Sequence, residues 1–466
     1  MQIDGFRGAL ITVDHPDYDA ARAVWNGSVD RRPRVIARCT GAADAAAAVR
    51  FARAQDLEIA VRGGGHNVAG TGVCDDGLVV DLSAMRAVSV DRATRTAWVQ
   101  GGALWGDVDH ETQTHGLATT GGIVSHTGVG GVSVGGGIGW LMRKYGLTVD
   151  NMAEAEVITA DGDVIRASVH DHPDLFWALR GGGGNFGVVS SFRFRLHSVG
   201  PVVVAGPVFW AAEDTTDVVA FYREFVGHAP DELGNLIRLG TIPPWPDVDE
   251  ELHFRPAIAV ASCYAGPVDE GERAIRPLRE FGTPLVDLVG PTPYVDHQRG
   301  IDDTVPHGWR YSWKSTNLTG LSDEVIRIVA EHAYKATSPR SMVVMFHMGG
   351  AVARVPRDAA AYPGRDAEYN IVIEGVSLPE QNDEVAAAEA AWARGFLEEL
   401  RPHRAGVYVN FLDADDDASR IRESYGDDTY RRLAEIKATY DPDNVFHHNK
   451  NIVPSETARA ASALRP

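Results

Sequence analysis

A single histidine follows three consecutive glycines in the segment VRGGGHNVAG, residues 61–70. An imidazole can act as a nucleophile, a general base or a metal ligand. Gly63, Gly64 and Gly65 lack a Cβ and each costs backbone entropy on folding, so their position beside His66 needs a physical reason. We expect a flat or phosphate-bearing group to come close to the backbone here.

Two more glycine clusters occur, at residues 128–137 and 181–184. The run GGGGNFG, residues 181–187, satisfies a G-x-G-x-x-G spacing, but a helix-like segment precedes it and a strand-like segment follows it. That order is the reverse of a Rossmann dinucleotide site, so a tight turn explains this run equally well. Because backbone N–H groups in such turns bind phosphates, the three clusters together favour an extended dinucleotide.

The composition limits the partners and the number of domains. The 466 residues carry 44 Lys and Arg against 64 Asp and Glu, a formal net charge of −20. This charge repels phosphate backbones and anionic lipid surfaces, so we expect neither a nucleic acid nor a membrane partner. The length exceeds what one hydrophobic core usually organises, which favours two domains.

The cysteines and the N-terminus indicate the compartment. Cys39, Cys74 and Cys263 are widely spaced and form no CxxC pair. This pattern fits neither a disulfide framework nor a structural zinc site. The adjacent histidines of HHNK, residues 447–450, give little support for a metal site, because neighbours on an extended run point to opposite faces. No signal-like or membrane-spanning stretch is evident, and we expect a cytoplasmic monomer or homodimer.

The elements that position these glycines alternate in type from residue 33. VIARC predicts a strand, DAAAAVRFARAQ a helix and LEIAVRGGG a second strand. From residue 77, short runs with period two predict a meander packed against that first unit. EAEVITADGDVI predicts a hairpin with a two-residue Asp-Gly turn, and DLFWALR a helix before the last glycine cluster and an alternating strand.

Longer elements follow after about residue 200. TTDVVAFYREFVGHAP and SDEVIRIVAEHAYKAT have the periodicity of amphipathic helices, whereas HFRPAIAVASCYAG and EYNIVIEGVSL are typical of strands. YRRLAEIKATYDPDN predicts a helix that ends at its Asp-Pro-Asp-Asn sequence. These segments indicate a second α+β domain.

Several motifs, in order along nearly the whole chain, resemble the berberine bridge enzyme-like branch of the vanillyl-alcohol oxidase flavoprotein family. They are RGGGHNVAG, DLSAM, SHTGVGGVSVGGGIGWLMRKYGLTVDN, DLFWALRGGGGNFGVV, YVNF and YDPDNVFHHNKNIVP. The resemblance implies an α+β fold, with a two-lobed PCMH-type FAD-binding domain and a substrate domain whose antiparallel sheet is covered by helices. The implied divisions are an N-terminal segment packed on the FAD domain, the FAD domain, the substrate domain and a segment that returns to the flavin, at residues 1–31, 32–200, 201–439 and 440–466.

By this resemblance, FAD is bound covalently through His66, whose neutral imidazole is a competent nucleophile near neutral pH. Many relatives carry a second tether, a cysteine at the position of Val124, so attachment is expected through His66 alone. Arg62 is either a structural cation at a strand end or a neighbour of the isoalloxazine. Asn449 and Asn451 match asparagines that brace the flavin site, with a capping role as the alternative. The expected FAD-binding set also includes Gly63, Gly64, Gly65, Asn67, Ser125, Gly128, Val129, Gly130, Gly131, Gly135, Gly136, Gly187 and Val188.

Two residues beside the missing cysteine are expected to act at the flavin. His126 and Thr127 could bridge to the N5/C4a edge, although His126 could equally be a turn histidine satisfied by backbone. By resemblance, the position of Thr127 controls oxygen access, and a valine there suits oxidases. Threonine has the shape of valine, which is compatible with direct use of O₂.

The resemblance places the catalytic base at Tyr408 in YVNF, with Asn410 and Lys314 as helpers. A free phenol titrates near about 10, so it needs hydrogen bonds or a cation to act near neutrality. The alternation of GVYVNFLD predicts a strand with Tyr408 and Asn410 on one face. Without the family match, Tyr408 would be an ordinary buried strand tyrosine. His347 would line the substrate side if its strand faces the cofactor.

The implied activity is that of an oxidase, which transfers a hydride from an alcohol, an amine or a secondary-metabolite carbon to flavin N5 and reduces O₂ to H₂O₂. Open alternatives are a dehydrogenase with another acceptor, a flavin-driven oxygenation or rearrangement, and a flavin-binding protein without turnover. The expected pocket segments are rich in apolar and aromatic side chains, which favours an apolar or aromatic small molecule. These side chains are Trp245, Tyr311, Trp313, Met345 and Met348.

Overall fold

A four-stranded sheet at the N-terminus is built from β1 (Ala9–Ile11), β2 (Val35–Arg38), β4 (Leu78–Asp81) and β3 (Ile59–Arg62), in that order. The last three strands are parallel, and α2 (Ala42–Ala54) makes the crossover between β2 and β3. Residues 78–81 were expected in a meander, which is wrong. All four of them are buried, as in a parallel strand that is covered on both faces.

A five-stranded antiparallel sheet follows, in the order β5-β6-β10-β8-β9. The predicted hairpin is present, but residues 159–163 connect its strands in place of a two-residue turn, closed by a hydrogen bond from Thr159 N to Asp163 O of 2.9 Å. The predicted helix before the last glycines is confirmed as α7 (Pro173–Leu179). The strands are β5 (Val88–Asp91), β6 (Thr96–Gln100), β8 (Met152–Ile158), β9 (Val164–Ser168) and β10 (Val188–Arg195), and the short helices beside them are α3 (Trp105–Gln113) and α4 (Val129–Gly135).

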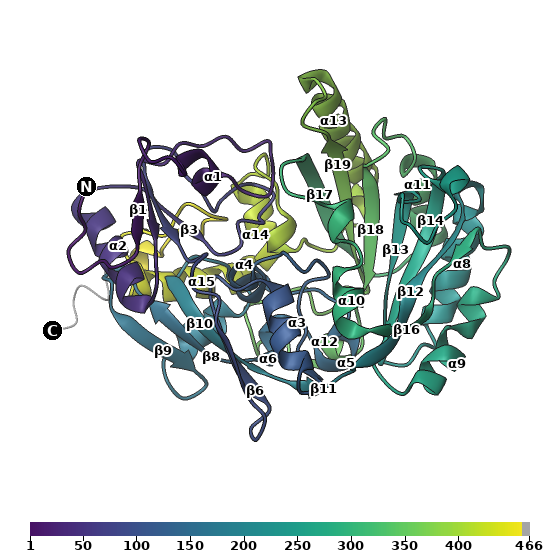
Figure 1. Ribbon diagram of the computed structural model, residues 1–466, viewed down its shortest axis with the longest axis horizontal. Coiled ribbons are helices and arrows are strands. Elements are labelled where there is room, and N and C mark those ends of the chain that lie inside the picture. The colour runs from purple at the N-terminus through teal and green to yellow at the C-terminus, as the bar shows by residue number, and fades with distance from the viewer. Residues whose placement is uncertain (459–466) are drawn as a thin grey trace.

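The middle of the chain forms a large antiparallel sheet in the order β15-β12-β14-β13-β18-β19-β17, with β16 paired to β12. Helices predicted from amphipathic patterns cover one of its faces, and their apolar side chains share a core with it (Figure 1). The strands are β12 (Val202–Ala211), β13 (Leu233–Thr241), β14 (Pro256–Tyr264), β15 (Val286–Asp287), β16 (Gly290–Pro293), β17 (Arg310–Leu318), β18 (Met342–His347) and β19 (Tyr369–Ser377). The helices are α8 (Thr215–Val226), α9 (Val268–Arg279), α11 (Asp323–His332) and α13 (Asp383–Glu399), with α10 (Tyr294–Arg299) on the inner side.

The structure, a computed structural model in which residues 1–458 are described, has two lobes (Figure 1). The first lobe contains the two N-terminal sheets, and the second contains the large sheet. The C-terminal helices α14 (Ala418–Tyr425) and α15 (Asp427–Tyr440) lie in the first lobe. Val407, Val409 and Leu433 already belong to its core, so the chain returns earlier than the expected residue 440. The end of the expected returning segment, residues 459–466, lies outside the described residues.

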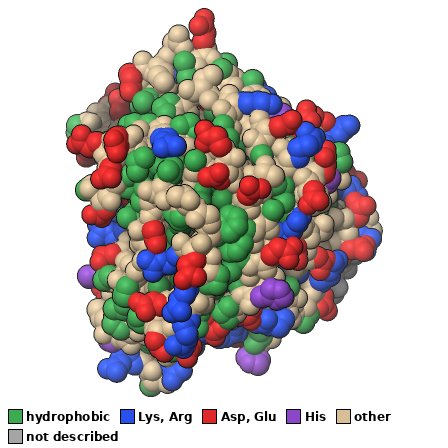
Figure 2. Space-filling view, turned by 90° about the vertical axis from the view of Figure 1, so that its right-hand side faces the viewer, with side chains coloured by type: hydrophobic (Ala, Val, Ile, Leu, Met, Phe, Trp, Pro, Cys, Tyr) green, Lys and Arg blue, Asp and Glu red, His purple; other side chains and the backbone are tan. Residues whose placement is uncertain are grey.

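The face of the second lobe seen in Figure 2 carries hydrophobic side chains in its middle, with acidic and basic side chains interspersed around them. No large basic area is visible on this face. Within residues 1–458, no helix is long and apolar enough to cross a membrane.

Candidate active site

A cavity of about 680 Å³ is lined by residues of both lobes. The first lobe contributes the turn after β3, the glycine-rich tract around α4 and the turn after α7. The second lobe contributes the uncovered face of the large sheet. The three glycine clusters, which are far apart in the sequence, therefore meet at one site.

Some of these glycines are required by the protein itself. A Cβ on Gly64 would lie 2.6 Å from the Cα of Gly128, and a Cβ on Gly63 would lie 2.9 Å from Gly101 O. At these positions backbone packs directly on backbone, so no side chain fits. They shape the wall of the cavity.

Two other glycines that line the cavity, Gly131 and Gly184, are not required by backbone packing. A Cβ added to Gly131, in α4, or to Gly184, in the turn after α7, would meet no atom within 4 Å. Both residues are exposed and line the cavity. The described structure leaves room for a Cβ there, so contacts within the protein do not explain why both positions are glycine.

His66 lies at the cavity wall within a group of aromatic rings. Its ring stacks on Trp25, with centroids 4.3 Å apart, and its Nε2 is 3.1 Å from Nδ1 of His126. The ring of His307 is close to both histidines, with centroid distances of 6.0 and 5.0 Å. Burial lowers the pKa of His66 well below its ordinary value, and the neighbouring histidines lower it further. The imidazole is therefore neutral and nucleophilic at neutral pH.

Tyr408 also lines the cavity and holds its phenol between two donors. Its Oη accepts hydrogen bonds of 2.8 Å from Gly137 N and from Asn410 Nδ2. The predicted strand is wrong, because Val409–Phe411 form a 3₁₀ turn, closed by a hydrogen bond from Phe411 N to Tyr408 O. Tyr408 and Asn410 nevertheless meet, because this turn brings the amide back onto the phenol.

Comparisons with known proteins match this site. Residues 33–168 match the FAD binding domain family and residues 407–453 the berberine and berberine-like family. An FAD-linked oxidoreductase of Dictyostelium discoideum is 32% identical over 434 residues, which cover 92% of this chain and 91% of the relative. The chain belongs to the berberine bridge enzyme-like family of FAD-linked oxidoreductases.

Two solved structures of FAD-linked oxidases have the same fold. The 6-hydroxy-D-nicotine oxidase of Arthrobacter nicotinovorans has a TM-score of 0.84 at 29% identity, covering 97% of this chain and 99% of its own. The xylooligosaccharide oxidase of Myceliophthora thermophila, in complex with xylobiose, has a TM-score of 0.83 at 26% identity, covering 96% and 98%. The expected family, its fold and its FAD-linked oxidoreductase chemistry are confirmed.

The cavity of this family member fits FAD at several points. Gly131 and Gly184 leave the space that a flat or phosphate-bearing group needs, and His66 presents a neutral imidazole to it. Asn449 donates from Nδ2 to Gly184 O at 3.0 Å, while its buried Oδ1 has no partner among the described residues. An unsatisfied buried acceptor at a cavity wall is expected where a ligand supplies the missing donor.

The other residues expected to hold FAD divide into two groups. Those that line the cavity are Gly63, Gly64, Gly65, Asn67, Val124, Gly128, Gly130 and Gly187. Those that do not line it are Ser125, Val129, Gly135, Gly136, Val188 and Asn451. Ser125 instead hydrogen-bonds Asp302, and Val129 and Val188 are buried in hydrophobic cores.

Arg62 makes the contacts of a structural cation at a strand end, one of its two expected roles, and it also lines the cavity. It donates from Nη2 and Nε to the carboxylate of Asp81, at 2.7 and 3.2 Å, and from Nη1 to Ala21 O. Asp81 lies directly opposite Arg62 in the parallel register of β3 and β4. The guanidinium therefore fixes the strand end that carries the glycine turn.

Thr127 lines the cavity, whereas His126 does not. His126 lies behind His66, and its Nε2 has no partner among the described residues. It is therefore placed to act on the imidazole of His66, and its place outside the cavity lining gives no support to the expected bridge to the flavin.

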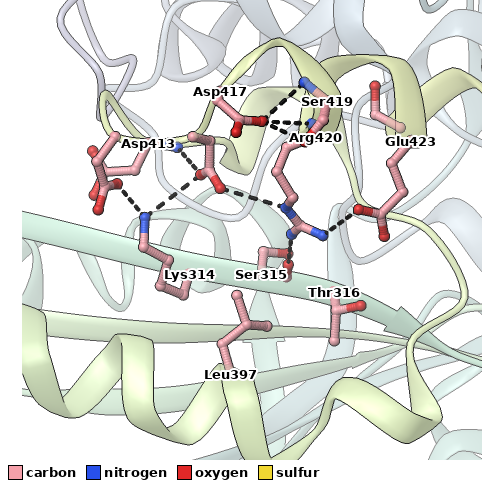
Figure 3. A network of polar contacts seen from close by, with 12 residues as sticks. Lys314, Ser315, Thr316, Leu397, Asp413, Asp417, Ser419, Arg420 and Glu423 are labelled. Carbon is pink, nitrogen blue, oxygen red and sulfur yellow. Dashed lines mark hydrogen bonds and ion pairs between the residues drawn. The ribbon is translucent and has the colours of Figure 1, made fainter.

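Lys314 is not beside Tyr408 but in a network of charged residues (Figure 3). Its Nζ binds the carboxylates of Asp415 and Asp416, which lie in the segment just before α14. Arg420 donates to Ser315 O at 3.0 Å in the same network. Because Lys314 follows Trp313 on β17, the two point to opposite faces of the sheet, and only Trp313 lines the cavity. The expectation that Lys314 assists the base is not supported by this placement.

Other expected pocket residues lie elsewhere. His347 faces away from the cavity, next to the cavity-lining Phe346, with its Nε2 3.2 Å from Arg143. Tyr311 donates from Oη to Pro306 O at 2.7 Å and stacks on Trp25. Among the expected wall residues, Trp245 and Trp313 line the cavity, and Tyr311, Met345 and Met348 do not.

Sequence reasoning missed Trp25, Arg238, Glu374 and Lys450, all of which line the cavity. Arg238 and Glu374 are the one charged residue in each of their strands, β13 and β19, and a charge in a buried strand is the signal that could have identified them. Nothing in the sequence near Trp25 indicates that its ring stacks on His66, 41 positions later. Lys450, whose pKa burial lowers to about 8, stood in a motif noted only for its asparagines and histidines.

Proposed function

We propose that this chain is an oxidase whose FAD is tethered covalently through His66 alone and which oxidises an alcohol, an amine or a secondary-metabolite carbon. Electrons pass to O₂, which is released as H₂O₂. The observation that carries the proposal is that a neutral, nucleophilic His66 and the doubly hydrogen-bonded Tyr408 line one cavity.

The hydrogen bond between the histidines supports the tether. When Nε2 of His66 donates to Nδ1 of His126, the free lone pair of His66 lies on Nδ1, the nitrogen available as a nucleophile. Val124 occupies the position of the second tether. The cysteines of the chain are buried, and none of them lines the cavity within residues 1–458. Within the described residues, no thiol is therefore available for a second covalent bond to FAD.

Bound FAD supplies the acceptor for a hydride, and the chain supplies the proton acceptor. The Oη of Tyr408 receives two hydrogen bonds, and the described residues offer no acceptor for its own proton. Both donors favour the phenolate, but burial dominates and raises the pKa of Tyr408 to about 12. Tyr408 acts as the base in its phenolate form, which has released its proton to solvent before the substrate binds, and its Oη takes up the substrate proton while Asn410 and Gly137 hold the oxygen in place.

Apolar surroundings and Thr127 support O₂ as the acceptor. Thr127 lines the cavity beside Val124 and Ile123, and its methyl and hydroxyl groups occupy about the volume of a valine side chain. A small side chain there leaves space for dioxygen. A dehydrogenase would share the rest of the site and would differ only in the compound that reoxidises the reduced flavin.

Stopped-flow mixing of photoreduced enzyme with aerated buffer tests the oxidase. We expect reoxidation much faster than that of free reduced flavin, with stoichiometric H₂O₂. Reoxidation at the rate of free flavin would exclude an oxidase and favour a dehydrogenase. A screen of alcohols, amines and oligosaccharides for peroxide release then identifies the substrate class, and the absence of flavin reduction by every compound would favour a binding protein.

A further inference from the structure

Two oppositely charged side chains, Arg238 and Glu374, lie on the cavity face of the large sheet. Arg238 of β13 pairs with Val344 of β18, and Val344 pairs with Val372 of β19. Directly paired residues share a face, and so do residues two apart on a strand, so Glu374 is on the same face as Arg238. Both charges point to the same wall of the cavity.

Arg238 has more donors than the protein uses. Its Nη1 donates to Thr241 O at 2.6 Å, and this is its one hydrogen bond to the described residues. Within residues 1–458 its guanidinium forms no ion pair, although Asp247 and Asp296 also line the cavity; burial lowers the pKa of Arg238 to about 10, and the charge of Glu374 opposes this shift. A guanidinium has five N–H groups and stays charged, so an unpaired one at a cavity wall is costly without an acceptor.

Glu374 likewise makes no hydrogen bond to the described residues. Its side chain is 7% exposed, and its buried Oε2 makes no hydrogen bond to the described residues. Burial raises its pKa to about 8, and Arg238 partly opposes the rise. At neutral pH the carboxyl group therefore holds its proton and can donate it in a hydrogen bond.

Apolar and aromatic side chains make up much of the rest of this wall, which also includes Asp247 and Asp296. Trp313 lies directly opposite Glu374 across β17 and β19, and Met342 lies opposite it across β18 and β19. Phe209 and Trp245 form an edge-to-face pair, with centroids 6.0 Å apart, and line the same cavity. A charged guanidinium and a neutral carboxyl donor are thus set in a surface that suits a ring.

We propose that Arg238 and Glu374 bind a carboxylate group of the substrate, and that the substrate is an aromatic carboxylic acid. This inference rests on the proposed oxidase function. The planar guanidinium matches both oxygens of a carboxylate, and the carboxyl group of Glu374 donates to one of them. The net positive charge of the pair selects an anion over an amine or a neutral polyol.

Equilibrium binding of four matched compounds to the FAD-loaded protein tests the proposal. The compounds are 3-phenylpropionate, its amide, 3-phenylpropanol and 3-phenylpropylamine, which differ only in the head group. The flavin absorption spectrum and the thermal unfolding temperature report binding. We expect the carboxylate to bind roughly tenfold or more tighter than the amide or the alcohol, since hydrogen bonds to charged groups contribute most. Equal binding of carboxylate and amide, tightest binding of the amine, or no binding of the carboxylate would overturn the proposal.

Variants assign the effect to the two residues. Arg238→Met should lose the preference for the carboxylate, and Arg238→Lys should keep part of it because the charge remains. Glu374→Gln retains a donor and should bind the carboxylate within about threefold of the wild type, whereas Glu374→Leu should bind it more weakly. Arg431→Met, on the exposed side of α15, is the matched control, and circular dichroism checks the fold of each variant.

The carboxylate-binding proposal and the oxidase proposal can fail independently of each other. Binding needs no turnover, so carboxylate selectivity can be present in a protein that fails to react with O₂. Conversely, peroxide release from alcohols or amines without any carboxylate preference would refute this inference and leave the oxidase intact. A strong loss of binding in Glu374→Gln would show that Glu374 acts as an ionised acceptor, which also contradicts the proposal.

Discussion

Nε2 of His66 and Nδ1 of His126 lie 3.1 Å apart, and the two rings are tilted by 34°. This contact connects a cavity residue with one that does not line the cavity, because His126 lies behind His66. Burial lowers the pKa of both imidazoles, which keeps both neutral near pH 7. A neutral His126 can therefore accept the Nε2 proton of His66 and fix the tautomer in which Nδ1 is nucleophilic.

Replacement of His126 by Phe should slow covalent attachment of FAD and leave the folded protein intact. The ring volume stays, but Nε2 of His66 loses its acceptor, and general-base assistance contributes about 10²- to 10⁴-fold. A time course of flavin fluorescence on denaturing gels, after FAD is added to flavin-free protein, measures the rate. His307→Phe is the control, because the ring of His307 is near His66 without a hydrogen bond to it among the described contacts. Equal attachment rates in wild type and His126→Phe would refute this role.

Tyr408→Phe should lower the rate of flavin reduction by about 10²- to 10⁴-fold and preserve the bound flavin, since only the hydroxyl is removed. Rapid mixing with a compound found by the peroxide screen measures this rate. Tyr362→Phe is a matched control, because Tyr362 is buried with its ring 6.1 Å from that of Tyr408 but does not line the cavity. A wild-type rate in Tyr408→Phe would move the base to another residue.

The pH profile gives a second test of Tyr408. Because burial raises its pKa to about 12, the basic phenolate is scarce at neutral pH and its fraction grows as the pH rises. The rate of flavin reduction should therefore increase with pH over the whole range in which the protein is stable. Tyr408→Phe should lack this increase, and an identical slope in both proteins would contradict the assignment.

Gly131→Val and Gly184→Val should bind much less FAD without destabilising the flavin-free protein. A Cβ at either position meets no atom within 4 Å, so we expect the larger side chain to clash with the occupant of the cavity and not with the protein. We expect the affinity to fall roughly tenfold or more, since overpacking costs about 1–3 kcal/mol. The ratio of flavin to protein absorbance and the unfolding temperature measure the two effects. Gly395→Val in α13, where a Cβ is equally free, is the control. Normal flavin content in both cavity variants would show that the occupant lies elsewhere.

Asp109→Asn should stabilise the protein above neutral pH. Asp109 is buried and accepts a hydrogen bond of 3.0 Å from Gln298, and burial raises its pKa to about 7. A raised carboxyl pKa gives stability that is full below the unfolded-state pKa of about 4 and is lost as the pH rises to about 7. The amide avoids this loss, so the variant should gain on the order of a few kcal/mol at pH 8 relative to pH 4.

Urea unfolding of wild type and Asp109→Asn at both pH values measures the difference. Asp428→Asn, on the surface of α15, should show no comparable change, because the wild-type carboxylate there is solvated. A stability difference that is independent of pH would contradict the buried titration of Asp109.

Much of the fold follows from local sequence patterns. The helices α8, α11 and α15 have the periodicity expected of them, because each packs one face on a core. The strands β14 and β19 are apolar runs that are buried along nearly their whole length. The meander prediction failed at residues 78–81, since four apolar or buried positions fit a parallel strand as well as an antiparallel one. Which sheet such a strand joins depends on its long-range partners.

The candidate site was predictable where glycines mark it and not where distant segments converge. The cavity positions of His66, Tyr408 and Thr127 agree with the expectation. The positions of His347 and Lys314 depend on which face of β18 and β17 meets the cavity. β18 is fully buried, and β17 is buried without interruption from Lys314 onward, so neither segment gives an alternation from which to read that face.

The most direct test of the central claim is mass spectrometry of tryptic peptides from acid-precipitated protein. Trypsin separates residues 63–86, which contain His66, from residues 96–143, which contain Val124 and His126. The account predicts that the first peptide carries the mass of FAD less the hydrogens lost on bond formation, that the second is unmodified, and that His66→Ala carries no flavin on either. Flavin on the second peptide, or no covalent flavin in the wild-type protein, would contradict a tether through His66 alone.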